Sequence, residues 1–585
     1  MTGEAVPVPA RAALAVLVVL VFLSPWPFGC AHPRLAGTIA LLALLTSLAV
    51  ALAALRWKAP FALPPPVWPL AGLIALAAVQ LLPLPSPLHG LLAPGPAAVW
   101  HPAEPEAAAV LGPGAFPLSV YPDGTREWLA FALGVSALAA LAVPALRDRR
   151  YALLSALVVG GGGLAVALFG IVARLLFGNR LYGEFAVPTV APFGPFVSKN
   201  HFAGYVEMAS LLALGLAFGL ADETRRKGGS LGWIEGSRAG RVVWALGAAG
   251  IMALAVLVSL SRGGVVSLAA GAIAFFALRA LVRRHPRARS ARYALVALMG
   301  LLALAALAFA VLPPGARARI LSLGGITGDL AGAFRLSVWR DTLRLAAASP
   351  ILGHGFGAYA DALPPFKTAA GTLRVEHAES DWLELLAEGG GVGLLLAGLF
   401  IVLAAGVAVR GLRAQDDRLR RGLGLGAAAA SLALLVHGAF DFNLHIPSNA
   451  ILFAFLLALL AGAAGAGGAV RPTGMGLLVL VLVGGVLAAL RAPGAGSPPD
   501  VSSLRRAVAT GDPRALRRAT AEAELVGHLR RRPADAEAWA MLAWVRATTK
   551  DSPPSGLLGR ARHLDPLNPG LAREVERLER GRPLR

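Results

Sequence analysis

The most chemically distinctive stretch of this 585-residue sequence is VEHAESDWLELLAEGGGVGLLL, residues 375–396, which places one histidine, one aspartate and four glutamates just before apolar chain. On a helix advancing about 100° per residue, four titratable side chains share one face: His377, Asp381, Glu384 and Glu388. Asp381 could then fix the tautomer of His377, as a general base requires. The alternative is a structural helix start, where the helix dipole favours acidic side chains.

Arginines at two places could bind phosphate oxygens. SLSRGGVVSLAAG sets Arg262 between two apolar runs with glycines after it, and a guanidinium group binds phosphate bidentately. RLSVWRDTLRLAAASPILGHGFGAYADALP carries arginines at near-helical spacing before a glycine-rich turn: Arg335, Arg340 and Arg344. Plainer interpretations are an Arg262 that snorkels to the membrane interface and an amphipathic helix with its cations outward.

Two further polar groups lie at the edges of apolar runs and are possible substrate contacts. GPFVSKNHFAGYVEMAS begins one run with Asn200 and His201, for which a simple interfacial role is the alternative. HGAFDFNLHIPSN spaces His437, Asp441 and His445 four residues apart, which could form a metal site. IPSN interrupts that pattern, so we predict no metal and retain His437 and Asp441 as substrate contacts. No P-loop, Rossmann glycine run or HExxH motif indicates a cofactor.

The elements that must position these residues are membrane-spanning helices. Hydrophobic residues make up 56% of the chain and charged residues 15%, which is too apolar for a soluble protein of this length. Recurrent apolar runs predict an all-α polytopic membrane protein of about thirteen transmembrane helices. Their predicted centres lie near residues 18, 45, 75, 137, 164, 210, 250, 273, 301, 395, 430, 457 and 482.

The cations indicate how these helices are oriented. The formal net charge is +21, but most cations lie in short loops, where they set topology and do not indicate nucleic acid. Basic loops alternate with loops of few cations, which places the N-terminus in the cytoplasm and the C-terminus outside. The unusual polar stretches then gather at the outer face, including one long loop, 313–381. The single cysteine, Cys30, excludes disulfides within the chain.

Composition divides the chain into three predicted domains. Residues 1–125 hold N-terminal transmembrane helices and a first outer loop, and residues 126–495 hold the transmembrane core. Residues 496–585 are rich in Arg, Glu and Ala without a long apolar run, which predicts a small soluble helical segment. The spacing from Pro533 to Pro566 is close to the period of about 34 residues in tetratricopeptide repeats. A plain helical hairpin is the alternative.

The order of SLSRGG, RLSVWRDTLRLAAASPILGHGFGAY, HAESDWLELLAEGGGVGLLLAG and FDFNLHIPSN resembles the O-antigen ligase and polymerase superfamily. GPFVSKNHFAGY is similar to a segment common in that superfamily, and the resemblance covers roughly residues 120–465. It implies a GT-C-like integral membrane glycosyltransferase of the bacterial inner membrane. The donor would be a glycan on a polyprenyl pyrophosphate lipid, used at the outer face without a cofactor or metal.

The resemblance also implies roles for individual residues. Arg262 and Arg335 match the arginines that hold pyrophosphate in the superfamily, and Arg340 is a third predicted ligand. His377 matches the first histidine of the frequent HAHND pattern. At the second histidine this chain has Glu379, and serine replaces asparagine at the next position. His377 is therefore our first choice as general base and Glu379 the second, with Asp381 completing the predicted catalytic set.

Several functions remain open within this interpretation. The acceptor could be lipid A core, another lipid-linked glycan or a protein, as in a ligase, a polymerase or a protein O-oligosaccharyltransferase. The helical segment 501–585 favours surface-polysaccharide assembly with a protein partner. A transporter of lipid-linked glycans is an alternative of another class, but transporters keep polar groups near mid-membrane. A non-enzymatic scaffold is the third possibility.

Overall fold

The computed structural model describes residues 6–58, 61–187, 191–224, 239–282, 330–369, 373–469, 472–491, 519–549 and 555–579. Contacts divide the chain into two compact units, each built from three separated stretches. Unit 1 comprises Met1–Pro69, Phe131–Ile326 and Gly398–Val486, and unit 2 comprises Leu70–Ala130, Thr327–Ala397 and Leu487–Arg585. The division into three consecutive domains stays a prediction.

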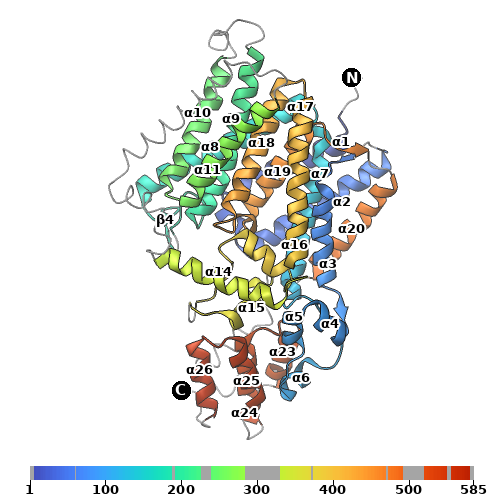
Figure 1. The fold of residues 1–585 in the computed structure, drawn as a ribbon, viewed down its shortest axis with the longest axis vertical. Helices are drawn as coiled ribbons and strands as arrows, with labels where there is room; N and C mark the ends of the chain where they lie inside the picture. The colour runs from blue at the N-terminus through green and yellow to red at the C-terminus, as the bar shows by residue number, and fades with distance from the viewer. Residues whose placement is uncertain are drawn as a thin grey trace. The chain divides into compact units, whose positions relative to one another are not determined.

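Within the described residues, eight helices are long and apolar enough to cross a membrane. They are α2 (Pro33–Arg56), α7 (Pro122–Leu146), α8 (Arg149–Phe177), α9 (Lys199–Thr224), α10 (Ala239–Val258), α11 (Arg262–Leu281), α16 (Asp381–Gly406) and α18 (Arg418–His437) (Figure 1). Further apolar helices are α1 (Val8–Leu23), α3 (Val67–Gln80), α19 (Pro447–Ala463) and α20 (Pro472–Arg491). The all-α membrane fold is thus confirmed. Every predicted centre lies within one of these helices except that near residue 301, which is outside the described residues.

Shorter elements connect these helices. The remaining α-helices are α4 (Ser86–Leu92), α5 (Pro94–Trp100), α6 (Pro105–Leu111), α14 (Leu330–Ala348), α15 (Tyr359–Ala362), α17 (Leu412–Ala414), α23 (Ala519–Leu529), α24 (Ala536–Thr549), α25 (Ser555–Leu564) and α26 (Pro569–Glu579). Single turns are η1 (Phe28–Cys30), η3 (Pro364–Phe366), η4 (Val407–Gly411) and η5 (Asn443–His445). Two-residue strands pair antiparallel: β1 (Ala62–Leu63) with β6 (Gly468–Ala469), β2 (Pro83–Leu84) with β3 (Phe116–Pro117), and β4 (Arg180–Leu181) with β5 (Phe185–Ala186).

Unit 1 is built around α9, which packs against α8, α10, α11, α18 and α19. The contact of α9 with α18 is close because glycines face one another. A Cβ added at Gly215 would lie 2.5 Å from the carbonyl oxygen of Gly422 and 2.6 Å from the Cα of Gly426. Small residues of this kind let helix backbones approach in a membrane, where packing contacts contribute most to helix association.

Unit 2 holds α14, the segment that follows it and the first half of α16. The predicted glycine-rich turn is confirmed, with positive φ angles of 70°, 107° and 72° at Gly353, Gly355 and Gly357. A Cβ at Gly353 would lie 2.2 Å from the carbonyl oxygen of Glu388, so this turn presses against α16. The same helix is kinked at Gly390, where φ is 61°.

The C-terminal helices α23–α26 form a small core in unit 2, which confirms a helical segment. Trp539 is completely buried at its centre, and its indole nitrogen donates to the carbonyl of Pro533 at 2.8 Å. The same core includes Val110 and Leu111 of α6, beside which α23 and α25 lie (Figure 1). Arg530 donates to the carbonyl of Val110 at 2.9 Å. The tetratricopeptide assignment stays a prediction.

Candidate functional site

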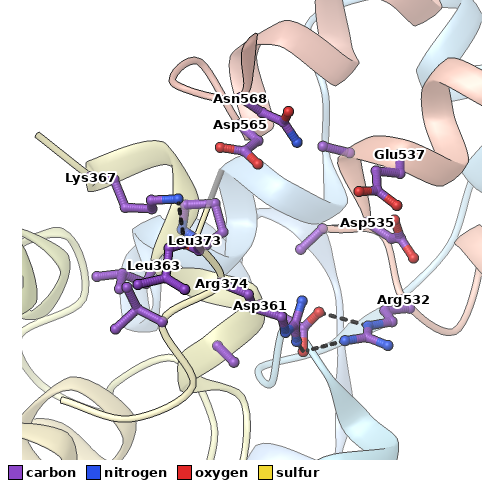
Figure 2. A pocket seen from close by; sticks show the side chains of 15 residues that line it. Asp361, Leu363, Lys367, Leu373, Arg374, Arg532, Asp535, Glu537, Asp565 and Asn568 are labelled. Atoms are coloured by element: carbon purple, nitrogen blue, oxygen red, sulfur yellow. Dashed lines mark hydrogen bonds and ion pairs between the residues drawn. The ribbon is translucent and has the colours of Figure 1, made fainter. Parts of the chain in front are cut away.

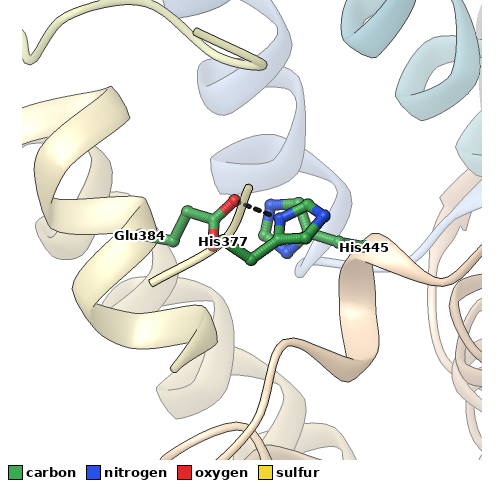
Figure 3. Close-up of side chains that lie close together, drawn as sticks. All are labelled: His377, Glu384 and His445. Atoms are coloured by element: carbon green, nitrogen blue, oxygen red, sulfur yellow. Dashed lines mark hydrogen bonds and ion pairs between the residues drawn. The ribbon is translucent and has the colours of Figure 1, made fainter. Parts of the chain in front are cut away.

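The His377 side chain is held by a buried carboxylate (Figure 3). Its Nδ1 lies 2.8 Å from Oε1 of Glu384, and the two side chains are 30% and 2% exposed. The other Glu384 oxygen, Oε2, accepts the backbone N–H of Ala378 at 2.8 Å. Because the carboxylate acts as an acceptor at both oxygens, we assign the proton to Nδ1 and the lone pair to Nε2. The ring is therefore oriented as a general base needs.

The structure corrects the predicted helical position of His377. The α16 helix begins only at Asp381, and residues 373–376 before His377 have no regular secondary structure. Glu379 adopts a φ of 55°, which is incompatible with a continuing right-handed helix. The prediction that His377 shares a helix face with Asp381 was therefore wrong. In this structure the imidazole contacts Glu384, in the first turn of α16, and Asp381 is the buried first residue of that helix.

Arg335 on α14 is tied to the segment that carries His377. Its guanidinium nitrogen Nη2 donates to Oε2 of Glu379 at 3.0 Å, and the indole of Trp339 donates to the Glu379 backbone carbonyl at 3.3 Å. These contacts hold the left-handed conformation of Glu379. Arg340 is exposed and lies about 140° around the helix from Arg335. The two predicted phosphate ligands of α14 therefore differ in setting: Arg335 is paired with Glu379, and Arg340 is exposed.

A buried amide braces this arrangement, and sequence reasoning missed it. Gln80, at the end of α3, donates to the carbonyls of Leu352 and Glu388 at 2.7 and 2.8 Å, and accepts the N–H of Phe356 at 3.0 Å. The Glu388 carboxylate in turn accepts the N–H of Tyr359 at 3.0 Å. These bonds fix the glycine-rich turn against α16. Glu388 thus has a structural role. The signal in the sequence that could have identified Gln80 was a polar residue at the end of an apolar run.

Unit 1 brings together another set of predicted residues, at the start of α11. Ser261 caps α11 by accepting the N–H of Gly264 at 3.2 Å, and its hydroxyl lies 2.9 Å from Oδ1 of Asn200. Lys199 donates to the carbonyl of Leu260 at 2.9 Å. Arg262 is the first residue of α11. The backbone that carries Arg262 is therefore fixed by the start of α9.

Two histidine–carboxylate contacts lie near that point in unit 1. Nδ1 of His437 is 3.1 Å from Glu207, both fully buried, and Ser267 donates to the same carboxylate at 2.6 Å. Nε2 of His201 is 3.6 Å from Asp441. Burial by itself raises the pKa of Asp441, but the His201 and His437 rings outweigh it and lower the pKa to about 2. Sequence reasoning missed Glu207, whose signal was an acidic residue inside an apolar helix.

Comparison with known proteins gives one family match, over part of the chain. Residues 247–398 match a family model described as O-antigen ligase. The chain carries an O-antigen ligase domain. The matched residues begin in α10 and end in α16, and so include Arg262, the α14 arginines and the segment of His377. A search of the curated proteins found no match.

The O-antigen ligase domain confirms the resemblance at the level of the superfamily, and the apolar helices agree with a membrane protein. In general terms, the family indicates glycosyltransferase-like ligase or polymerase activity. Asn200, His201, His437 and Asp441 lie outside the matched residues. Their roles, like those of the residues inside the O-antigen ligase domain, stay predictions. The expectation that the reaction uses no metal or cofactor also stays a prediction.

Proposed function

We propose that this protein transfers a glycan from a polyprenyl pyrophosphate carrier to a hydroxyl acceptor at the outer face of the bacterial inner membrane. The O-antigen ligase domain supports the class of reaction. The contact between His377 and Glu384 is the observation that carries the proposal. A partly exposed imidazole with a buried carboxylate behind it has the features of a general base for an acceptor hydroxyl.

In the proposed reaction, the acceptor hydroxyl gives its proton to Nε2 of His377 while its oxygen forms a bond to the anomeric carbon of the donor glycan. The bond from that carbon to the pyrophosphate oxygen breaks, and the polyprenyl pyrophosphate leaves with the electron pair. Glu384 stabilises the imidazolium ion that results, since its carboxylate is already hydrogen-bonded to Nδ1. The reaction needs no oxidant or reductant, and no co-reactant besides the donor and the acceptor.

Arginines are the proposed ligands of the leaving group. Negative charge develops on the pyrophosphate as the glycosidic bond breaks, and fixed cations stabilise it best where water is scarce. We assign this role to Arg262, Arg335 and Arg340. The pairing of Arg335 with Glu379 supports the assignment because it orients the guanidinium group before substrate binds. The same pairing engages the Glu379 carboxylate, which favours His377 over Glu379 as the base.

Ligation of the glycan to an acceptor lipid such as lipid A core is our first proposal. Polymerisation onto another lipid-linked glycan and transfer to a protein hydroxyl use the same base and the same leaving group. Transport of the lipid-linked glycan is the alternative of another class. A transporter does not need a general base, so a requirement for the His377 imidazole distinguishes the enzyme from the transporter.

The test is complementation of a gene deletion. Cells would receive the wild-type gene, His377→Ala, or Glu524→Gln, a control on the exposed face of α23. We expect His377→Ala to insert at wild-type levels but to reproduce the deletion on gels of lipopolysaccharide and free polymer. Accumulated unligated glycan indicates a ligase, short chains a polymerase, and loss of glycoprotein a protein transferase. Normal glycans in the His377→Ala strain would contradict the proposal.

A further inference from the structure

Unit 2 contains a cavity formed jointly by residues before His377 and the C-terminal helices (Figure 2). Its volume is about 350 Å³, within the range of about 300–1,000 Å³ of small-molecule sites. One wall comes from α15, residues 363–367 and residues 373–375. The other comes from the turn between α23 and α24 and the turn between α25 and α26.

An ion pair joins these two walls. Asp361 accepts from Nε of Arg532 at 2.6 Å and from Nη2 at 3.0 Å, so the guanidinium group grips it at two points (Figure 2). Arg374, half exposed, approaches the same carboxylate at 3.5 Å. Lys367 donates to the carbonyl of Leu373 at 3.1 Å. Charged side chains from distant parts of the sequence are thus brought together and hydrogen-bonded around the cavity.

The mixture of charges indicates the class of ligand. Four acidic side chains, Asp361, Asp535, Glu537 and Asp565, line the cavity together with the cations Lys367, Arg374 and Arg532. This near balance is unfavourable for a phosphate or nucleic acid, which selects cations alone. A sugar hydroxyl, by contrast, both donates and accepts a hydrogen bond, so it needs carboxylates and guanidinium groups side by side.

The cavity adjoins the proposed base. Val375 lines it, and His377 follows only two residues later. At about 3.3–3.6 Å per residue, the two Cα atoms lie within about 7 Å of each other. A saccharide seated in the cavity could therefore place a neighbouring hydroxyl near the His377 imidazole.

We propose that this cavity binds the saccharide part of the acceptor, so that the C-terminal helices form half of the acceptor site. The inference rests on the proposed function, since it names the acceptor as a glycan. It differs from the role predicted for 501–585 as a docking segment for a protein partner.

Binding by the full-length protein in lipid nanodiscs tests the inference. The probe is the oligosaccharide mixture released by mild acid from the envelope of the source bacterium, titrated calorimetrically. We expect Glu537→Gln and Arg374→Gln each to raise Kd about tenfold or more, as loss of a charge-assisted hydrogen bond does. Both side chains are exposed, so neither change threatens folding. Matched controls are Glu524→Gln and Arg562→Gln, exposed on α23 and α25 outside the cavity.

The outcomes separate the cavity from the catalytic proposal. His377→Ala should bind the oligosaccharides as tightly as wild type, because its effect is on proton transfer. Saccharide binding without any transfer by the wild type would refute the proposed function and leave the cavity assignment standing. Equal Kd values for cavity variants and controls would overturn the inference. The inference would also be overturned if the cavity variants weakened the binding of unstructured decapeptides and left oligosaccharide binding unchanged.

Discussion

Glu384 performs two tasks at the residue scale. One carboxylate oxygen orients the His377 ring and the other anchors the backbone at Ala378. Hydrogen bonds to a charged group contribute about 1.5–3 kcal/mol each, so rotation of the imidazole away from this carboxylate is costly. The buried position of Glu384 at the start of α16 also lets the helix dipole favour its negative charge.

A prediction at the residue scale concerns Asp535, which anchors the turn between α23 and α24. Burial by itself raises its pKa, but the His528 ring, Arg532 and the Ala538 amide outweigh burial and lower the pKa from 3.8 to about 2. A lowered pKa stabilises the fold by about 2 kcal/mol above about pH 4, and this contribution is lost as the pH falls toward 2.

Thermal unfolding followed by tryptophan fluorescence checks this pH dependence. The difference in Tm between wild type and Asp535→Asn should be large at pH 6 and should shrink at pH 2.5. Glu524→Gln should match wild type at both values. An equally large difference at both pH values would show that Asp535 does not titrate as described.

The residue scale also shows what sequence alone can find. The density of acidic residues around His377 identified the stretch that carries the candidate base. The partner of that base was not predictable, because the helix start at Asp381 and the positive φ of Glu379 depend on Arg335 and Trp339 of α14. The helical-spacing argument assumed a continuous helix from His377 to Glu388. Tertiary contacts instead hold residues before Asp381 in a non-helical conformation.

At the scale of elements, the fold depends on the close approach of α9 and α18. Gly215→Ala adds a methyl group 2.5 Å from the Gly422 carbonyl oxygen, and we expect a loss of about 1–3 kcal/mol from overpacking. Gly247→Ala in α10 is the control, because its added Cβ meets nothing within 4 Å. Thermal unfolding in one detergent measures both. Equal stability of the two variants would contradict the packing argument.

Apolar runs were sufficient to predict the apolar helices but not the contacts that hold them together. Every described apolar helix was expected from hydropathy because a span needs about 20 apolar residues. The kink at Gly390 and the hydrogen bonds that Gln80 makes to Leu352, Phe356 and Glu388 were not expected. Gln80 and Glu388 are 308 positions apart in sequence, and such a pair leaves no periodic signal.

At the scale of the whole molecule, the predicted topology can be tested by cysteine labelling. Cys30 is buried, and burial raises the pKa of its thiol to about 11, so the native background should be low. We expect Arg562→Cys to react with an impermeant maleimide when the outer membrane is permeabilised and the inner membrane is intact. Arg150→Cys, exposed at the start of α8 on the side predicted to be cytoplasmic, should react only after the inner membrane is broken. The opposite pattern would invert the proposed orientation.

The C-terminal segment shows the limit of sequence reasoning at this scale. Its helices were predicted from composition. Their core, however, includes Val110 and Leu111, and Glu106 accepts the N–H of Gly556 at 3.0 Å. Contacts between such distant stretches depend on the tertiary fold. They make the segment part of unit 2 and bring it to the cavity near His377.

Glycan transfer by the protein reconstituted in liposomes, with the polyprenyl pyrophosphate-linked glycan and acceptor of the source bacterium, tests the central claim most directly. A general base contributes about 10²–10⁴ in rate, so we predict that His377→Ala lowers kcat by that factor. Glu384→Gln should lower kcat by a smaller factor, and Glu379→Gln should affect it least. Wild-type turnover by His377→Ala, or its abolition by Glu379→Gln alone, would contradict the account.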